Sequence, residues 1–296
     1  MLQDLSDLLV LWSIYLLFAQ GMSLVWGSIG ILNFAHGAIF MFSAFTGYLV
    51  SQELRLGLLG MTVLGTCVGA GLSAAMHVLV VEPILRRSAN AAAAELRALI
   101  ASVGIAAVLL AVAQASTRSV PFGLGRMEEA TSVHSFGSVR LSLIQLLIIG
   151  AGLVVTTCMV WWLRTAKSGL ALQAIGLDRE TASLMGVRRT RLAVTAMAVA
   201  GGLAGLAAVL LTYHLGSIAA ESGDAMVLKA FSAIVLGGVG HAYAVIAGTL
   251  LLAAAETAVL TYTSGTWVDA VSYGLIFVVL LVRPQGLLGR AEVRRT

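Results

Sequence analysis

The sequence is poor in charge. Only 11% of its 296 residues are Asp, Glu, Lys or Arg, while 59% are hydrophobic. Soluble globular domains carry about 25% charged residues, so this chain has too little charge to cover a surface that faces water. The composition therefore excludes an ordinary soluble domain.

Cysteines and the usual catalytic motifs are also lacking. The two cysteines, Cys67 and Cys158, lie inside apolar runs, which excludes a disulfide framework and predicts no metal site. The five histidines are scattered. The sequence contains no His-Glu-x-x-His pair, no Gly-x-Ser-x-Gly elbow and no Gly-x-x-x-x-Gly-Lys-Ser/Thr phosphate loop. We therefore expect no catalytic residue, metal or cofactor in this chain, and any energised work must draw on another chain or an ion gradient.

Long apolar runs are abundant and set the fold class. A helix needs about 20 residues to cross the hydrocarbon layer, and only helices and closed barrels satisfy their backbone hydrogen bonds there. The runs lack the alternation of barrel strands, so we predict an all-α, polytopic transmembrane bundle in one domain, residues 1–296. Six runs are clear spans: residues 8–26, 56–81, 141–163, 192–211, 242–262 and 268–282. Three shorter ones, some of them possible broken helices, bring the total to about eight or nine segments: residues 33–50, 99–115 and 227–240.

The distribution of Lys and Arg predicts the orientation. Loops rich in these residues stay in the cytoplasm, and the basic connections are residues 82–97, residues 164–191 and the tail from Arg283. The N-terminus is then periplasmic and the C-terminus cytoplasmic, which requires an odd number of crossings. Acids rather than basic residues precede the first run, which indicates a retained span and not a signal peptide. The connection at residues 116–140 fits least well, because it also contains three arginines.

Glycine is plentiful, with 32 residues, and two pairs follow the small-xxx-small pattern. The pairs are Gly65 with Gly69 and Gly201 with Gly205. Small residues at this spacing let membrane helices approach closely. The pairs could form a contact between subunits, but packing inside one bundle is the simpler interpretation.

The stretch around Asn33 is typical of a broken membrane helix. Glycines precede Asn33, and His36 and Gly37 follow it. Backbone that leaves the helix at membrane depth must be covered by protein or line a cavity, and transporters place substrate sites at such breaks. Asn33, His36 and Gly37 are therefore candidates for the translocation pathway. The alternative is a buried hydrogen bond between helices, made by Asn33 or His36.

A second glycine-rich turn and a mid-span acid complete the pathway candidates. Gly237 and Gly238 begin the turn, and Lys229 precedes them. Lys229 could attract a carboxylate, although a side chain that snorkels to water is the simpler explanation. Glu256 lies midway along an apolar run, and an ionisable group at such a depth is a functional candidate by default. It could bind an ammonium group or pair with a buried donor, whereas we expect Asp269 to be interfacial.

The connection at residues 164–191 carries six of the 18 Lys and Arg residues but only two acids. We predict two short amphipathic helices in it, residues 170–175 and 181–187, with Asp178 as the N-cap of the second. A short helix with small residues suits docking into a groove of a partner. We interpret this connection as the docking site of a cytoplasmic subunit, and call it the coupling loop.

The coupling loop carries a family resemblance. Residues 180–186 resemble the Glu-Ala-Ala-x-x-x-Gly motif of permease subunits of bacterial ABC importers, with Thr181 in the place of an alanine. More closely, the chain resembles the branched-chain amino acid permeases of the LivH type. Five segments carry this likeness, in order and over nearly the whole chain: residues 30–37, 174–180, 228–231, 235–240 and 283–287.

The resemblance implies a permease subunit in the bacterial inner membrane that moves branched-chain or other small amino acids. It implies a heterodimer with a second permease, two cytoplasmic ATPase subunits that use ATP and Mg, and a periplasmic substrate-binding protein. The chain itself would hold no ATPase site. The motif assigns coupling to the ATPase to four residues of the loop: Asp178, Glu180, Ala182 and Gly186.

Two alternatives stay open. The first is the same importer class with urea or a short amide as cargo. The second is an ATP-independent secondary transporter or channel, since Asn33-Phe34-Ala35 faintly resembles the Asn-Pro-Ala turns of water channels. That motif occurs once and lacks its proline, and a gradient-driven carrier should show more acids inside its spans than Glu256.

Overall fold

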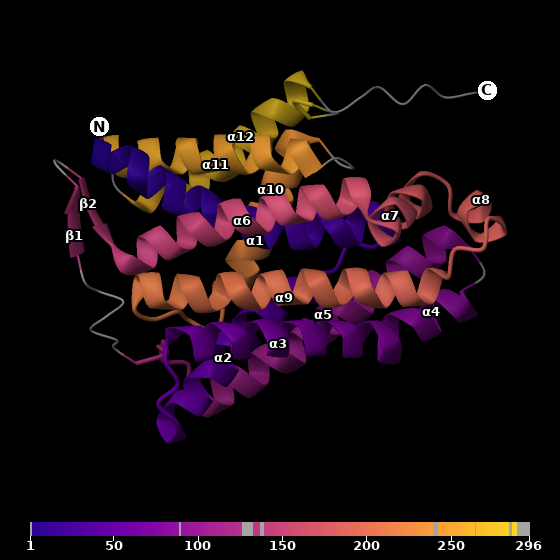
Figure 1. Ribbon diagram of the computed structural model, residues 1–296, viewed down its shortest axis with the longest axis horizontal. Coiled ribbons are helices and arrows are strands. Elements are labelled where there is room, and N and C mark those ends of the chain that lie inside the picture. Colours follow the sequence, from indigo (N-terminus) through magenta and orange to yellow (C-terminus); the bar gives the residue numbers. More distant parts are fainter. Residues whose placement is uncertain are drawn as a thin grey trace.

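The computed structural model describes residues 2–88, 90–125, 133–136, 139–238, 242–263, 265–283 and 286–288. Within these residues the chain forms an elongated helical bundle with one small β-hairpin (Figure 1). The helices are α1 (Leu2–Ile29), α2 (Ala35–Glu53), α3 (Leu58–Met76), α4 (Glu82–Arg87), α5 (Ala91–Thr117), α6 (Leu143–Thr165), α7 (Lys167–Leu177), α8 (Arg179–Leu184), α9 (Arg189–Leu215), α10 (Ser222–Gly237), α11 (Ala242–Tyr262) and α12 (Val268–Val282). A π-helical turn, His77–Val81, joins α3 to α4, and a 3-10 turn, Gly265–Trp267, precedes α12.

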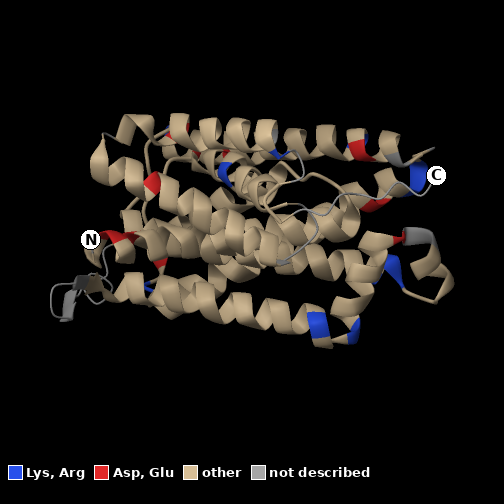
Figure 2. Cartoon of the chain, turned by 90° about the horizontal axis from the view of Figure 1, so that it is seen from above, with Lys and Arg blue, Asp and Glu red and all other residues tan. Residues whose placement is uncertain are grey.

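Most helices run along the long axis of the bundle, and their connections gather at its two ends (Figure 1). The N-terminus and the hairpin of β1 (Val133–Phe136) and β2 (Val139–Ser142) lie at one end, which we call the hairpin end. Helices α4, α7 and α8 lie at the opposite end, which we call the loop end. Lys and Arg gather at the loop end (Figure 2).

The membrane class predicted from the sequence is confirmed. Six helices are long and apolar enough to cross a bilayer: α1, the continuous Leu58–Arg87 stretch, α5, α6, α9 and α11. Each of the nine predicted segments contains a helix among its described residues, but the ranking of one of them was wrong. Helix α5 has 27 residues, because the side chain of Asn90 caps its first turn. The helix therefore begins before the apolar run and contains Glu95 and Arg97. Helix α12 has the predicted bounds, residues 268–282, and with 15 residues it is shorter than the six long apolar helices.

The β-hairpin lies in the connection between α5 and α6, where the sequence predicted no regular structure. Its two strands pair antiparallel, with Val133 opposite Ser142. Ser142 then begins α6 through a capping box, in which its hydroxyl accepts from the Gln145 amide and the Gln145 side chain accepts from the Ser142 amide. The hairpin is small, so the all-α class stands.

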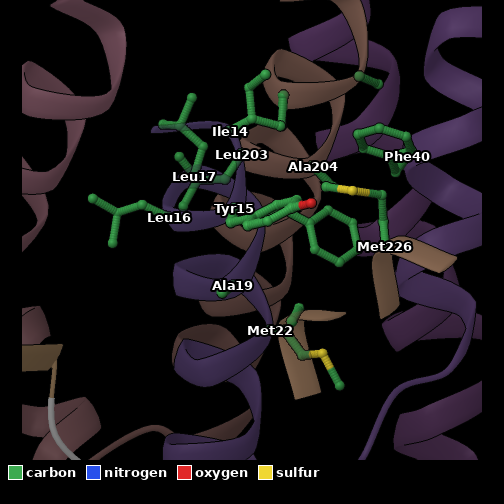
Figure 3. Packing of buried hydrophobic residues seen from close by; sticks show 14 of the residues in the cluster. Ile14, Tyr15, Leu16, Leu17, Ala19, Met22, Phe40, Leu203, Ala204 and Met226 are labelled. Atoms are coloured by element: carbon green, nitrogen blue, oxygen red, sulfur yellow. The ribbon is translucent and has the colours of Figure 1, made fainter. Parts of the chain in front are cut away.

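Helix α1 occupies the centre of the bundle. Every residue from 13 to 22 is buried, which is the pattern of a helix surrounded on all sides. Figure 3 shows Tyr15, Leu16 and Leu17 of α1 in one cluster with Leu203 of α9 and Met226 of α10. The core is therefore built around the first helix. This packing agrees with a retained membrane span, because removal of α1 would expose the core.

The glycine pairs found in the sequence pack inside the bundle. Gly65 and Gly69 of α3 face Gly201 and Gly205 of α9, and a Cβ added at any of the four would overlap atoms of the facing helix. At Gly69, for example, the added atom would overlap the carbonyl oxygen of Gly201. The α3–α9 contact therefore depends on backbone approach that only glycine permits.

A matched pair of variants in α3 tests this packing. Gly69→Val should lower the unfolding free energy by about 1–3 kcal/mol, because the larger residue forces the backbones of α3 and α9 apart. Gly71→Val is the control, since Gly71 is exposed and an added Cβ there meets no atom within 4 Å. Unfolding by SDS titration in mixed micelles measures both, and equal destabilisation would contradict the close α3–α9 contact.

Candidate functional site

The strongest polar feature inside the bundle surrounds Glu256 of α11, which is only 1% exposed. Lys229 Nζ of α10 lies 3.0 Å from Glu256 Oε2. The Tyr15 hydroxyl of α1 donates to the same oxygen at 2.5 Å, and the Ser272 hydroxyl of α12 donates to Glu256 Oε1 at 2.6 Å. Three donors from three other helices thus converge on one carboxylate.

Lys229 joins the carboxylate to the surface of the bundle. Its ammonium also donates to the Tyr15 hydroxyl oxygen at 3.1 Å and lies 3.7 Å from Asp269 Oδ1 on α12. The Lys229 side chain is 13% exposed, whereas that of Asp269 is 69% exposed. We call these five residues the ion cluster: Tyr15, Lys229, Glu256, Asp269 and Ser272.

The ion cluster decides two questions that the sequence left open. Lys229 does not snorkel to water; its ammonium turns into the bundle, because Glu256 lies one helix away. Glu256 is paired with a buried donor in this conformation, the ammonium of Lys229. A single charge at the centre of a membrane helix costs about 3 kcal/mol, and the pairing offsets part of that cost for both groups.

Helix α10 connects the ion cluster with the glycine candidates. Near its start, Gly223 packs against Gly37 of α2, and at its end Gly237 packs against Ala244 of α11. At both contacts a Cβ would overlap a carbonyl oxygen of the facing helix. Gly238 follows with φ of 104°, which ends the helix in a conformation that favours glycine. Gly37, Gly237 and Gly238 therefore position α10, with Lys229 between them.

The break between α1 and α2 packs against the middle of α5 and is mostly covered by protein. The Phe34 amide donates to Ser102 Oγ at 3.2 Å, in the interior of α5, and the Asn33 side chain accepts from the Ala35 amide at 3.0 Å. His36 is 1% exposed, and its Nε2 lies 3.3 Å from the carbonyl oxygen of Phe18 on α1. The buried hydrogen bond between helices, which was the alternative for His36, is therefore present.

A small cavity adjoins this break. Its volume is about 10 Å³, and Val25, Asn33, Met76, Ser102 and Met197 are among its lining residues. Asn33 Nδ2 has no hydrogen-bond partner in the described part of the chain. The space is about that of one water molecule, so it does not hold an amino acid in this conformation. The structure brings Asn33 and His36 together, but Glu256 belongs to the separate ion cluster.

The coupling loop forms two helices, as predicted, with different bounds. Helix α7 (Lys167–Leu177) is longer than residues 170–175, and α8 (Arg179–Leu184) is shorter than residues 181–187. Asp178 caps α8 through a hydrogen bond from the Thr181 amide to Asp178 Oδ1 at 3.1 Å, which confirms the predicted N-cap. The side chain of Glu180 lies outside the described residues.

The coupling loop presents apolar side chains at its surface. Leu177, Leu184 and Met185 are 89%, 86% and 80% exposed, whereas Ala182 is buried. Gly186 has φ of 81° and open space around it, so it reverses the chain in a conformation that other residues adopt at a cost. Large apolar groups gathered on a basic loop indicate a surface that contacts another protein.

The exit of the loop is tied to the end of the Leu58–Arg87 stretch. The Thr190 hydroxyl at the start of α9 donates to Glu82 Oε1 at 2.9 Å, and Arg86 Nε donates to the same oxygen at 2.8 Å. The π-helical turn His77–Val81 directly precedes Glu82, and such turns often mark functional positions in membrane-length helices. Thr190 and Glu82 therefore connect the exit of the loop to α4.

Sequence reasoning missed two members of the ion cluster, Tyr15 and Ser272. Neither stands out, because a tyrosine or serine inside an apolar run is ordinary. It also missed a contact between two landmark segments, in which the Leu287 and Leu288 amides donate to the carbonyl oxygens of Leu236 and Gly237. These bonds satisfy the C-terminal carbonyls of α10. No group of three or more His, Cys, Asp or Glu in the described residues is placed to hold a metal.

Comparison with known proteins gives a consistent picture. Residues 5–280 match the family described as branched-chain amino acid transport system / permease component. The chain is 30% identical over 300 residues to the high-affinity branched-chain amino acid transport system permease protein LivH of Escherichia coli K12, covering 99% of this chain and 97% of that protein. It is 29% identical over 302 residues to the corresponding protein BraD of Pseudomonas aeruginosa, with the same coverage. A partial match, 28% over 136 residues, is to the autoinducer 2 import system permease protein LsrC of Salmonella choleraesuis, covering 44% of this chain and 39% of that protein.

The ion cluster makes a prediction about stability. Lys229→Met should lower the unfolding free energy by about 3–5 kcal/mol, because it leaves Glu256 buried and unpaired. The double variant Lys229→Met with Glu256→Gln should lose much less, since no buried charge remains without a partner. Asp269→Asn is the control, because an exposed ion pair contributes about 0–1 kcal/mol. SDS titration measures all three, and a loss in the double variant as large as that in Lys229→Met would contradict the pairing.

Proposed function

Since this chain belongs to the permease components of branched-chain amino acid transport systems, we propose that it forms half of a paired membrane pathway. A second permease of related type would supply the other half, and two cytoplasmic ATPase subunits would drive transport with ATP and Mg. A periplasmic binding protein would deliver the amino acid. The likeness over almost the full length of LivH and BraD carries this proposal. It favours a branched-chain amino acid over urea or a short amide as cargo.

The coupling loop is the proposed contact with the ATPase. Three exposed apolar residues, Leu177, Leu184 and Met185, surround the short helix α8. A short helix with apolar anchors fits a groove on a partner. Asp178 holds the helix start, Ala182 packs it inward, and Gly186 turns the chain away, while Glu180 belongs to the same motif. The bond between Thr190 and Glu82 then carries motion of the loop to α4.

The translocation pathway is proposed to follow α10. This helix packs against Gly37 on one side and ends at Gly237 and Gly238 on the other. Glu256 pairs with the lysine in its middle. Asn33 and His36 belong to the break that adjoins α2. In this proposal the single membrane domain, residues 1–296, moves these contacts when the coupling loop moves.

The proposed orientation puts the loop end in the cytoplasm and the N-terminus in the periplasm of a bacterial inner membrane. Lys and Arg at the loop end (Figure 2) support it, because such residues accumulate on the cytoplasmic side. The tail after Arg283 is basic in sequence and is assigned to the same side.

Cysteine labelling tests this orientation. In a background with Cys67→Ala and Cys158→Ala, single variants Ala174→Cys in α7 and Gln52→Cys in α2 place exposed thiols at the two ends. An impermeant maleimide should label Gln52→Cys in intact spheroplasts and Ala174→Cys only in inverted vesicles. The reverse pattern would overturn the assignment.

A matched glycine pair tests the docking role. Gly186→Val should abolish amino acid uptake while the protein stays folded and inserted, because it distorts the loop beside α8. Gly125→Val is the control: Gly125 has φ of 84°, also has open space around it and lies away from the coupling loop. Both variants carry a similar backbone strain of about 1–2 kcal/mol. Normal substrate-stimulated ATP turnover by Gly186→Val in the assembled transporter would refute docking through the loop.

A further inference from the structure

A transporter of free amino acids must move two opposite charges through a low-dielectric bundle. Each charge is costly there unless an opposite charge or several hydrogen bonds meet it. This requirement follows from the proposed function, and the inference below rests on it. A site for such a substrate therefore needs a cationic and an anionic side chain close together inside the bundle.

The ion cluster contains such a pair. Lys229 is the sole Lys or Arg in the sequence between Arg191 and Arg283, and its ammonium lies 3.0 Å from the mid-span acid Glu256. Removing both charges from a buried pair is often neutral or stabilising for a fold. Stability therefore gives no strong reason to place this pair inside the helices.

The chemistry of the ion cluster complements an amino acid backbone. An α-carboxylate needs a cation and hydroxyl donors, and an α-ammonium needs a carboxylate and further oxygen acceptors. Lys229 and Glu256 supply the two charges, while the hydroxyls of Tyr15 and Ser272 already bond to the Glu256 carboxylate at 2.5 and 2.6 Å. These hydroxyls would hold the carboxylate in place after Lys229 leaves it.

The cluster also reaches the surface of the chain. Lys229 borders an exposed face of α10 formed by Asp224, Ala225 and Leu228, and its ammonium lies 3.7 Å from the exposed Asp269. Lys229 therefore has a second carboxylate within reach on its exposed side. A change of partner from Glu256 toward a substrate requires movement of one side chain rather than unfolding of a helix.

We propose that Lys229 and Glu256 form the charge-recognition site of the pathway. The Lys229 ammonium binds the α-carboxylate of the passing amino acid, and the Glu256 carboxylate binds its α-ammonium. In the closed conformation the two side chains neutralise each other, and the zwitterion replaces that ion pair with two new ones. The site thus recognises the backbone common to amino acids and leaves selection among side chains to other contacts.

Uptake by the complete transporter tests the site. The double variant Lys229→Met with Glu256→Gln should reach the membrane in normal amounts and copurify with the ATPases, yet lose uptake of labelled leucine by about tenfold or more. The matched control replaces another buried polar pair, Gln20 and Thr156, which are 2.9 Å apart between α1 and α6. Gln20→Leu with Thr156→Val should keep its uptake. Normal uptake by the Lys229–Glu256 double variant would reduce the pair to a structural clamp and overturn the proposal.

A binding measurement on the unmodified transporter tests the same site and does not depend on the folding of a variant. In nanodiscs without binding protein, leucine should raise the melting temperature of the complex. Isoamylamine and 4-methylpentanoate, which each lack one of the two charges, should not. Equal protection by all three compounds, or none by leucine, would contradict the site. The proposed function and the charge-recognition site are tested separately. If the wild-type chain does not copurify with an ATPase, the importer function is refuted, whatever the binding measurement shows.

Discussion

The ion pair between Lys229 and Glu256 is the constraint around which the polar groups in the C-terminal half of the bundle are arranged. It joins α10 to α11, and the Tyr15 and Ser272 hydroxyls extend it to α1 and α12. Inside a membrane neither charge can be solvated by water, so each is stabilised by staying close to the other. Four helices that are far apart in sequence are thereby held in one relative placement around a single carboxylate.

Helix α10 is held by a second kind of contact, which needs no charge. Gly223 meets Gly37 near its start, and Gly237 meets Ala244 at its end, both at distances that only glycine allows. The amides of Leu287 and Leu288 then satisfy its last carbonyl groups. Close backbone packing fixes the two ends, while the middle is joined to α11 by a salt bridge, which the proposed site would exchange for contacts with the substrate. This difference makes the middle of α10 the natural place for a ligand-dependent change.

The sequence predicted the class of the fold and most helix positions, because apolar runs of membrane length have few other solutions. It also located Glu256, Lys229 and the N-cap Asp178, since charged and capping residues stand out against an apolar background. It did not predict the pairing of Lys229 with Glu256 or the roles of Tyr15 and Ser272. The pairing and these roles depend on which helix faces pack together. A run that is hydrophobic on every side has no periodic pattern from which the packed face can be predicted. The length of α5 was misjudged, because the Asn90 cap starts the helix before the apolar run begins. The bounds of α12, residues 268–282, were predicted correctly.

The coupling loop and the ion cluster are joined by one series of helix contacts. The coupling loop leads through Thr190 and Glu82 to α4 and the Leu58–Arg87 stretch, which packs on α9 through the facing glycines. Helix α9 in turn packs against α1, which carries Tyr15 of the ion cluster. A chain of rigid contacts therefore runs from the loop to the hydroxyl that holds Glu256. If the coupling loop moves as proposed, the close glycine contacts between α3 and α9 require whole helices to shift, because no loosely packed layer separates them.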